Sequence, residues 1–173
     1  MDVPEGLTLK RNRDLVGRER DPWTRRILLG LVVLLLALGL ANVFGQRPST
    51  STAGAPEVKL TVYAPERLRA GLMFMARFHI TAQRDLGNAT LVLDPGWLES
   101  MTLNTIEPSP VNETSRDGRL ALDFGHLPRG DELIAFLDFQ VNPTNVGHRS
   151  QDVDLDDGEQ TLVHIDRSVT VFP

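Results

Sequence analysis

The spacing of hydrophobic residues divides the chain into two kinds of segment. From Ile27 to Phe44 the sequence reads ILLGLVVLLLALGLANVF, without a charged side chain. From Glu57 onward, apolar and polar residues alternate, as they do in strands that bury one face. The pattern therefore predicts one apolar helix over residues 27–44 and an all-β region over residues 57–173.

The predicted helix is long enough to cross a membrane, because roughly 20 residues at about 1.5 Å each span a hydrocarbon core of about 30 Å. Residues 1–26 hold seven basic side chains, and the next basic residues are Arg47 and Lys59. Basic residues favour the cytoplasmic side. We therefore expect a basic cytoplasmic tail over 1–26 and a single-pass transmembrane helix over 27–44 in the lipid bilayer of the cell membrane. The C-terminal domain would then be extracytoplasmic.

A cleaved export signal is the alternative to this anchor. Gly39 and Ala41 are small residues of the kind found before a cleavage site, and residues 24–29 resemble a twin-arginine signal. The apolar run is nevertheless longer than the roughly 7 to 15 residues of a signal sequence. The pattern favours an uncleaved signal-anchor.

The region after the helix predicts a linker and then a sandwich. Residues 45–56 read GQRPSTSTAGAP, a composition typical of a flexible linker. Beyond it, turn residues such as Asp157 and Gly158 separate about eight or nine short strands. The strongest alternation runs from Leu133 to Val141. This spacing predicts an immunoglobulin-like antiparallel β-sandwich over residues 57–173.

Charge and cysteine content exclude several functions. Residues 48–173 hold ten basic and eighteen acidic side chains, a balance that repels phosphate backbones. We therefore expect no nucleic-acid binding. The chain contains no cysteine, which excludes disulfides, thiolate nucleophiles and cysteine zinc sites.

No motif in the sequence indicates an enzyme or a cofactor. There is no nucleophile elbow and no phosphate-binding glycine loop. The histidines show no metal-ligand spacing and are predicted to be surface residues; they are His79, His126, His148 and His164. A hydrolase would need an acid and a histidine brought together by the fold, which spacing alone does not exclude.

Asp152, Asp154 and Asp156 are weak candidates for a metal site, because clustered carboxylates supply the oxygen ligands that calcium prefers. The spacing does not match an EF-hand loop. Alternation with Val153 and Leu155 predicts instead that these aspartates lie on the solvent face of a strand.

Four apolar residues fall on strand faces that are predicted to be exposed to solvent. Met73, Met75, Ile134 and Phe136 alternate out of phase with the core positions of their strands. Exposed apolar patches mark interaction surfaces; if loops cover these residues, they are part of the core instead.

The leading hypothesis is a non-enzymatic accessory protein that binds another protein at the cell surface, with a multi-pass membrane protein as candidate partner. The alternative is a ligand-binding module for cell-wall glycan or a divalent cation.

Three segments carry a resemblance to known proteins: DLGNATLVLDPGWLESM, GHLPRG and FQVNPTNVG. They resemble the immunoglobulin-like adhesion and accessory modules of bacterial surface proteins. The layout as a whole resembles a group of uncharacterised membrane-anchored proteins of high-GC Gram-positive bacteria. The resemblance covers most of residues 9–173. It implies the fold and an extracytoplasmic location, and it supplies no activity and no site residues.

Overall fold

The computed structural model describes residues 21–43 and 45–173, which form two units that divide between Val43 and Phe44. The first unit is helix α1 (Asp21–Leu40), whose apolar side chains are almost all exposed. Pro22–Leu40 is a stretch of 19 residues that is long and apolar enough to cross a membrane. The predicted apolar helix is confirmed, with shifted ends.

Two boundaries of that helix differ from the prediction. Of the predicted tail, residues 1–20 lie outside the described residues, and residues 21–26 belong to α1. Arginine favours helix almost as well as leucine does, so Arg25 and Arg26 continue the helix although they are not apolar. At the other end α1 stops at Leu40, and residues 41–43 form a turn.

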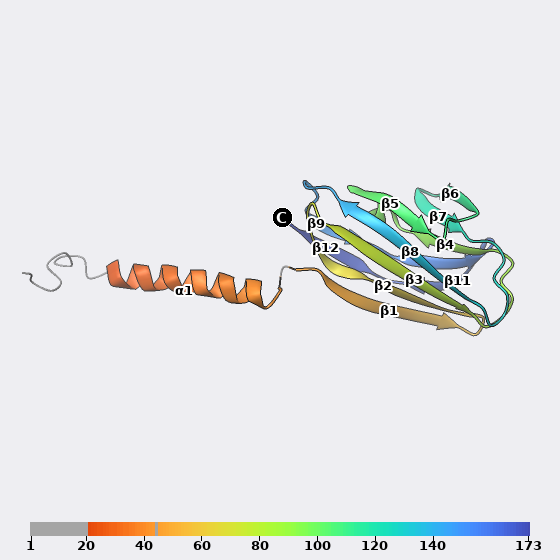
Figure 1. Ribbon diagram of the computed structural model, residues 1–173, viewed down its shortest axis with the longest axis horizontal. Helices are drawn as coiled ribbons and strands as arrows, with labels where there is room; N and C mark the ends of the chain where they lie inside the picture. Colours follow the sequence, from red (N-terminus) through yellow and green to blue (C-terminus); the bar gives the residue numbers. More distant parts are fainter. Residues whose placement is uncertain (1–20, 44) are drawn as a thin grey trace, which may run out of the picture. The chain divides into compact units, whose positions relative to one another are not determined.

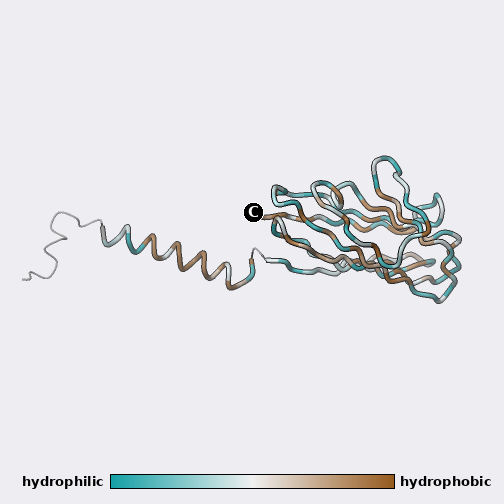
Figure 2. The backbone as a smooth tube through the Cα atoms, turned by 45° about the horizontal axis from the view of Figure 1, so that its top comes forward, coloured by the Kyte–Doolittle hydropathy of each residue, from teal (hydrophilic) through white to brown (hydrophobic). Residues whose placement is uncertain are grey.

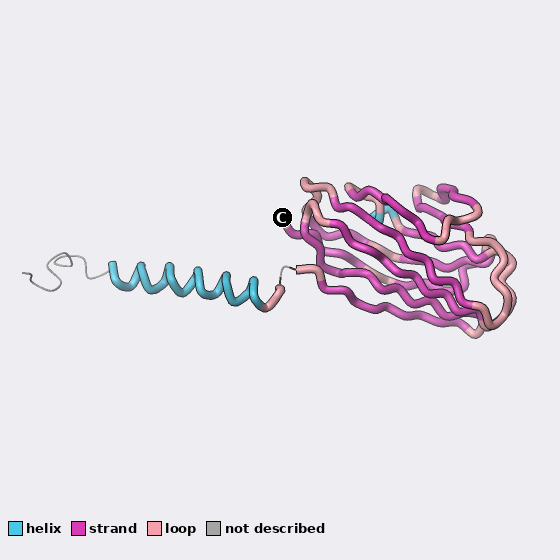
Figure 3. The backbone as a smooth tube through the Cα atoms, viewed as in Figure 1, coloured by secondary structure: helices cyan, strands magenta, loops and turns pink. Residues whose placement is uncertain are grey.

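The second unit is a sandwich of two sheets (Figures 1 and 3). One sheet has the strand order β5-β8-β3-β2-β12-β9, with β1 paired to β2, and the other has the order β11-β10-β4-β7-β6. The strands of the first sheet are β1 (Arg47–Ala55), β2 (Val58–Arg69), β3 (Met73–Ala82), β5 (Met101–Glu107), β8 (Glu132–Val141), β9 (Gly147–Ser150) and β12 (Ser168–Phe172). Those of the second are β4 (Ala89–Leu93), β6 (Asn112–Arg116), β7 (Arg119–Asp123), β10 (Val153–Asp157) and β11 (Gln160–Ile165).

The strand pairing confirms the all-β immunoglobulin-like sandwich. The named strands pair antiparallel, except for the short parallel contact between β2 and β12. Alternate residues of β2, β3 and β8 point between the sheets and are almost completely buried. Figure 2 shows brown, hydrophobic stretches along the strands of the sandwich and teal, hydrophilic stretches mostly in the loops. The hydrophobic core therefore lies where the period-two pattern predicts it.

Trp97 is one of the largest side chains of the core. It lies in a short 3-10 helix (Pro95–Trp97), is fully buried, and packs against Phe78 and Phe139 with ring centroids 5.5 Å away in each case. Its indole N–H donates to the carbonyl of Gln151 at 3.0 Å. The buried indole therefore has its hydrogen bond, as a core tryptophan requires.

The prediction of a flexible linker over residues 45–56 is wrong. Arg47–Ala55 forms β1, which pairs with β2 from Arg47↔Arg67 to Ala55↔Val58. Ser, Thr and Ala side chains give little apolar signal, but the backbone groups of this segment are satisfied by a neighbouring strand. The domain therefore begins about ten residues earlier than residue 57, with the unit boundary at Phe44.

Candidate functional site

The structure offers two candidate surfaces, one on the outer face of each sheet. On the seven-stranded sheet, the exposed fractions of Met73, Met75 and Ile134 are 60%, 50% and 40%. Phe136 is half-buried. The described loops therefore do not cover these side chains, and their predicted outward orientation is confirmed.

These four residues form a diagonal stripe across β3 and β8. In the register of the two strands, Met75 lies opposite Asp138 and Phe136 lies opposite Arg77. Phe136 is therefore the diagonal neighbour of Met75, a spacing within reach of long and aromatic side chains. Met73 and Ile134 extend the stripe at its two ends. We call these four residues the apolar stripe.

Polar and aromatic groups flank the apolar stripe. The Arg77 guanidinium lies over the Tyr63 ring, 5.1 Å from its centroid. Next to it, His79 Nε2 lies 3.0 Å from a Glu132 carboxylate oxygen. Met, aromatic residues and Arg are the types enriched in protein interfaces. The composition of this face is therefore that of an interaction surface with a polar rim.

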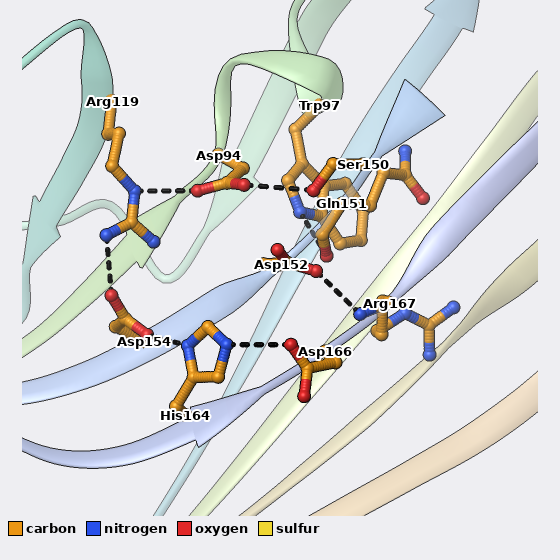
Figure 4. Close-up of polar contacts among 10 residues, drawn as sticks. All are labelled: Asp94, Trp97, Arg119, Ser150, Gln151, Asp152, Asp154, His164, Asp166 and Arg167. Atoms are coloured by element: carbon orange, nitrogen blue, oxygen red, sulfur yellow. Dashed lines mark hydrogen bonds and ion pairs between the residues drawn. The ribbon is translucent and has the colours of Figure 1, made fainter. Parts of the chain in front are cut away.

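The second surface, on the five-stranded sheet, is a network of charged side chains (Figure 4). Arg119 on β7 lies between two carboxylates: its Nε is 2.7 Å from Asp94 Oδ1, and its Nη1 is 2.5 Å from Asp154 Oδ2. Asp94 also accepts a hydrogen bond from the Ser150 hydroxyl at 3.0 Å. The network thus ties β7, β9 and β10 together.

The prediction of solvent-exposed aspartates on β10 is wrong. Asp154 and Asp156 do point away from the core, but their exposed fractions are only 8% and 7%. Arg119 covers the first, and Arg116 lies 3.3 Å from Asp156 Oδ2. The sequence did not reveal this burial, because the arginines come from the β6–β7 hairpin, about 40 residues earlier.

The three predicted metal candidates do not converge on one point. Asp154 and Asp156 are engaged by Arg119 and Arg116, whereas Asp152 accepts a hydrogen bond from the Arg167 backbone N–H at 2.8 Å. Instead, Asp152 groups with His164 and Asp166, whose ligand atoms all lie within 4.8 Å of one another. Sequence spacing missed this group because β10 and β11 bring its members together across a hairpin.

His164 is held by a carboxylate at each ring nitrogen. Its Nδ1 bonds to Asp154 Oδ1, and its Nε2 lies 3.0 Å from Asp166 Oδ1. The hydrogen bonds that its ring makes to these two carboxylates raise the pKa of His164 above its usual value. Burial alone would raise the pKa of Asp154, but hydrogen bonds from His164 and Arg119 outweigh it and lower that pKa.

A groove of about 520 Å³ adjoins this network on the β6, β7, β10 and β11 side. Its lining is mostly charged and polar, with Arg116, Arg119, Asp154, Asp156 and Glu159 among its residues. The lining holds two arginines and four carboxylates, so the groove carries an excess of negative charge even though both arginines pair with aspartates.

Comparisons with known proteins add no family. No family model and no curated protein matches the chain. Among solved structures the chain is similar to CaCohA2 from Clostridium acetobutylicum, with 17% identity, a TM-score of 0.42, and coverage of 60% of this chain and 85% of that one.

Two further solved structures show likenesses of the same order. The C-terminal domain of wzt has 14% identity and a TM-score of 0.43, with 75% of this chain and 81% of that one covered. The third cohesin ScaC of Acetivibrio cellulolyticus, solved in complex with the ScaB dockerin, has 14% identity and a TM-score of 0.38, with 61% and 92% covered. These TM-scores are too low to support an argument about function, so the site is argued from this chain's own residues.

Proposed function

We propose that this chain is a membrane-anchored, extracytoplasmic accessory protein whose sandwich binds another protein through the apolar stripe. The observation that carries the proposal is the exposure of Met73, Met75 and Ile134 on a sheet face that is otherwise polar. Removing such side chains from water on binding contributes about 25 cal/mol per Å² of apolar surface. A partner would therefore gain most from covering this stripe.

The helix supports a partner in the same membrane. α1 has the length and apolarity of a single span, and the basic residues before it favour a cytoplasmic N-terminus. Only six residues separate Leu40 from Arg47. A multi-pass membrane protein with an outer loop is the partner that this layout favours.

The contacts of His164 support binding rather than hydrolysis. A serine hydrolase needs one imidazole nitrogen facing the nucleophilic hydroxyl and the other facing an acid. Here both nitrogens face carboxylates, those of Asp154 and Asp166. The nearby Ser150 hydroxyl donates to Asp94 instead. We therefore include no catalytic role in the proposal.

Site-specific crosslinking tests the proposal, because the chain has no cysteine of its own. Met73→Cys carries a photo-crosslinker at the apolar stripe, and Val146→Cys, at a residue 50% exposed in a loop, is the matched control. In native membranes we expect one discrete adduct from position 73 that is absent from position 146.

A second variant tests whether the stripe itself binds. Met75→Ser combined with Phe136→Ser should abolish the position-73 adduct while the circular dichroism of the domain is unchanged. The same adducts from both cysteine positions, or an adduct that survives the double substitution, would reject the proposal.

A further inference from the structure

The second sheet carries a group of ligand atoms that the proposed function does not use. Asp152, just before β10, His164 on β11 and Asp166, just after β11, each offer one donor atom, and these atoms lie within 4.8 Å of one another. Figure 4 shows the three side chains beside the Arg119 network. They lie on the sheet opposite to the apolar stripe.

The donor set of this group selects a class of metal. One imidazole nitrogen with two carboxylate oxygens suits zinc and neighbouring first-row divalent ions. Calcium and magnesium prefer sites made of oxygen atoms alone. The histidine therefore changes the expectation from calcium, which carboxylates alone would favour, to a zinc-class ion.

The neighbours of His164 fix its ring in the orientation that a ligand needs. Nδ1 is bonded to Asp154, and Asp154 is held in turn by Arg119. Nε2 is thereby left to face Asp166. A carboxylate on the ring nitrogen that does not bind the metal is the usual support of a metal-ligating histidine. Asp152 is likewise held in place, by the Arg167 backbone N–H.

The charge around the group also favours a cation. Asp152, Asp154 and Asp166 surround His164, and Arg119 pairs with one of them, Asp154. The Arg167 guanidinium points away from the group, because its Nη2 donates to the Ala64 carbonyl on β2. A divalent ion between Asp152, His164 and Asp166 would offset this excess of carboxylate.

We propose that Asp152, His164 and Asp166 bind one divalent zinc-class ion, with His164 Nε2 as the nitrogen ligand. Asp154 and Arg119 act as positioning residues for the His164 ring. Three protein ligands leave a tetrahedral ion one further position. Because His164 and Asp166 are exposed, solvent reaches this group of ligands.

Calorimetry with zinc chloride on the full chain, purified in detergent without a histidine tag and stripped with chelator, tests the site. We expect one zinc per chain. His164→Gln and Asp166→Asn should each weaken binding at least about tenfold, and Asp154→Asn should weaken it about 10- to 100-fold through the ring orientation. His126→Gln, at another exposed histidine, is the matched control and should bind as the parent does.

Two further measurements keep the test decisive. His164 and Asp166 are exposed, so their variants should keep the circular dichroism spectrum of the parent. Cobalt substituted for zinc should give visible absorption bands that disappear in Asp166→Asn even if His164→Gln fails to fold. No binding at millimolar zinc, or equal binding by Asp166→Asn and the parent, would overturn the proposal, as would loss of binding in His126→Gln.

Discussion

The Arg167 guanidinium donates a hydrogen bond to the Ser51 hydroxyl at 3.1 Å, across 116 positions of the chain. The same side chain donates to the Ala64 carbonyl at 2.9 Å and is only 6% exposed. It thereby joins the segment before β12 to β1 and β2. This contact adds a side-chain bond to the backbone pairing that holds β1, a strand rich in small polar residues, against β2.

Arg167→Met should destabilise the sandwich. Methionine has a similar length, but it removes the hydrogen bonds of the guanidinium to the Ala64 carbonyl and the Ser51 hydroxyl, and a hydrogen bond from a charged group contributes about 1.5–3 kcal/mol. Urea unfolding followed by Trp97 fluorescence, in a Trp23→Phe background, measures the change. Arg69→Met, at an exposed arginine of β2, is the control and should change stability by less than about 0.5 kcal/mol. Equal midpoints for the two variants would contradict this role of Arg167.

The sequence predicts those strands that bury alternate apolar residues and misses those that do not. β3 and β8 alternate strictly, and both are predicted. β1, β6 and β9 are missed. β6 has four exposed residues followed by one half-buried residue, and among the described strands its one partner is β7. Such strands are held by backbone hydrogen bonds, which leave no hydrophobic period in the sequence.

The two candidate surfaces also differ in how far the sequence predicts them. The apolar stripe follows from the phase of alternation within two strands, so Met73 and Ile134 are predicted correctly. The cluster around His164 depends on which strands pair with one another, and the residue pattern within a single strand does not show this. Asp154 and Arg119 meet only because β4 pairs with β10 on one edge and with β7 on the other.

Gly96→Ala should be strongly destabilising. A Cβ at Gly96 would lie 1.8 Å from the backbone oxygen of Ser150, closer than any atom contact allows. The 3-10 helix would have to move away from β9, and this would displace Trp97 from the core. We expect a loss of more than about 3 kcal/mol or no folded domain, since strain and core disruption combine.

Gly54→Ala on β1 is the matched control for Gly96→Ala. Its Cβ would lie 3.7 Å from the nearest atom, an ordinary contact. Thermal unfolding by circular dichroism should therefore separate the two variants clearly. A Gly96→Ala protein with the melting temperature of Gly54→Ala would show that the approach of the two backbones is looser than described.

The His164–Asp154 pair should make stability depend on pH in chelator-treated protein. The pKa of His164 is raised from 6.5, so its contribution is complete below about pH 6.5 and is lost as pH rises through the folded-state pKa. The pKa of Asp154 is lowered from 3.8, so its contribution is present above about pH 3.8 and is lost as pH falls through its folded-state pKa. The pair therefore stabilises most between these limits.

Unfolding midpoints measured from about pH 2 to about pH 9, a range that extends past the ordinary pKa values of both groups, check this dependence. His164→Gln should remove the decline on the alkaline side, whereas His148→Gln, whose ring bonds to the Thr170 hydroxyl, should keep it. Because the His164 side chain is half exposed, solvent screening keeps the effect small. An alkaline decline that persists in His164→Gln would assign it to another group.

A charge in the middle of α1 should prevent membrane anchoring. Arginine at the centre of a spanning helix costs about 2.5–3.5 kcal/mol on insertion scales. Leu34 lies near the centre of Pro22–Leu40 and is exposed, so Leu34→Arg places this charge without disturbing the sandwich. After alkaline extraction of membranes we expect the parent chain and Leu34→Val in the pellet and a large part of Leu34→Arg in the supernatant.

A tag at the N-terminus that is retained on the pelleted chain distinguishes an uncleaved anchor from a processed signal. A parent chain found in the supernatant without that tag would contradict the anchor.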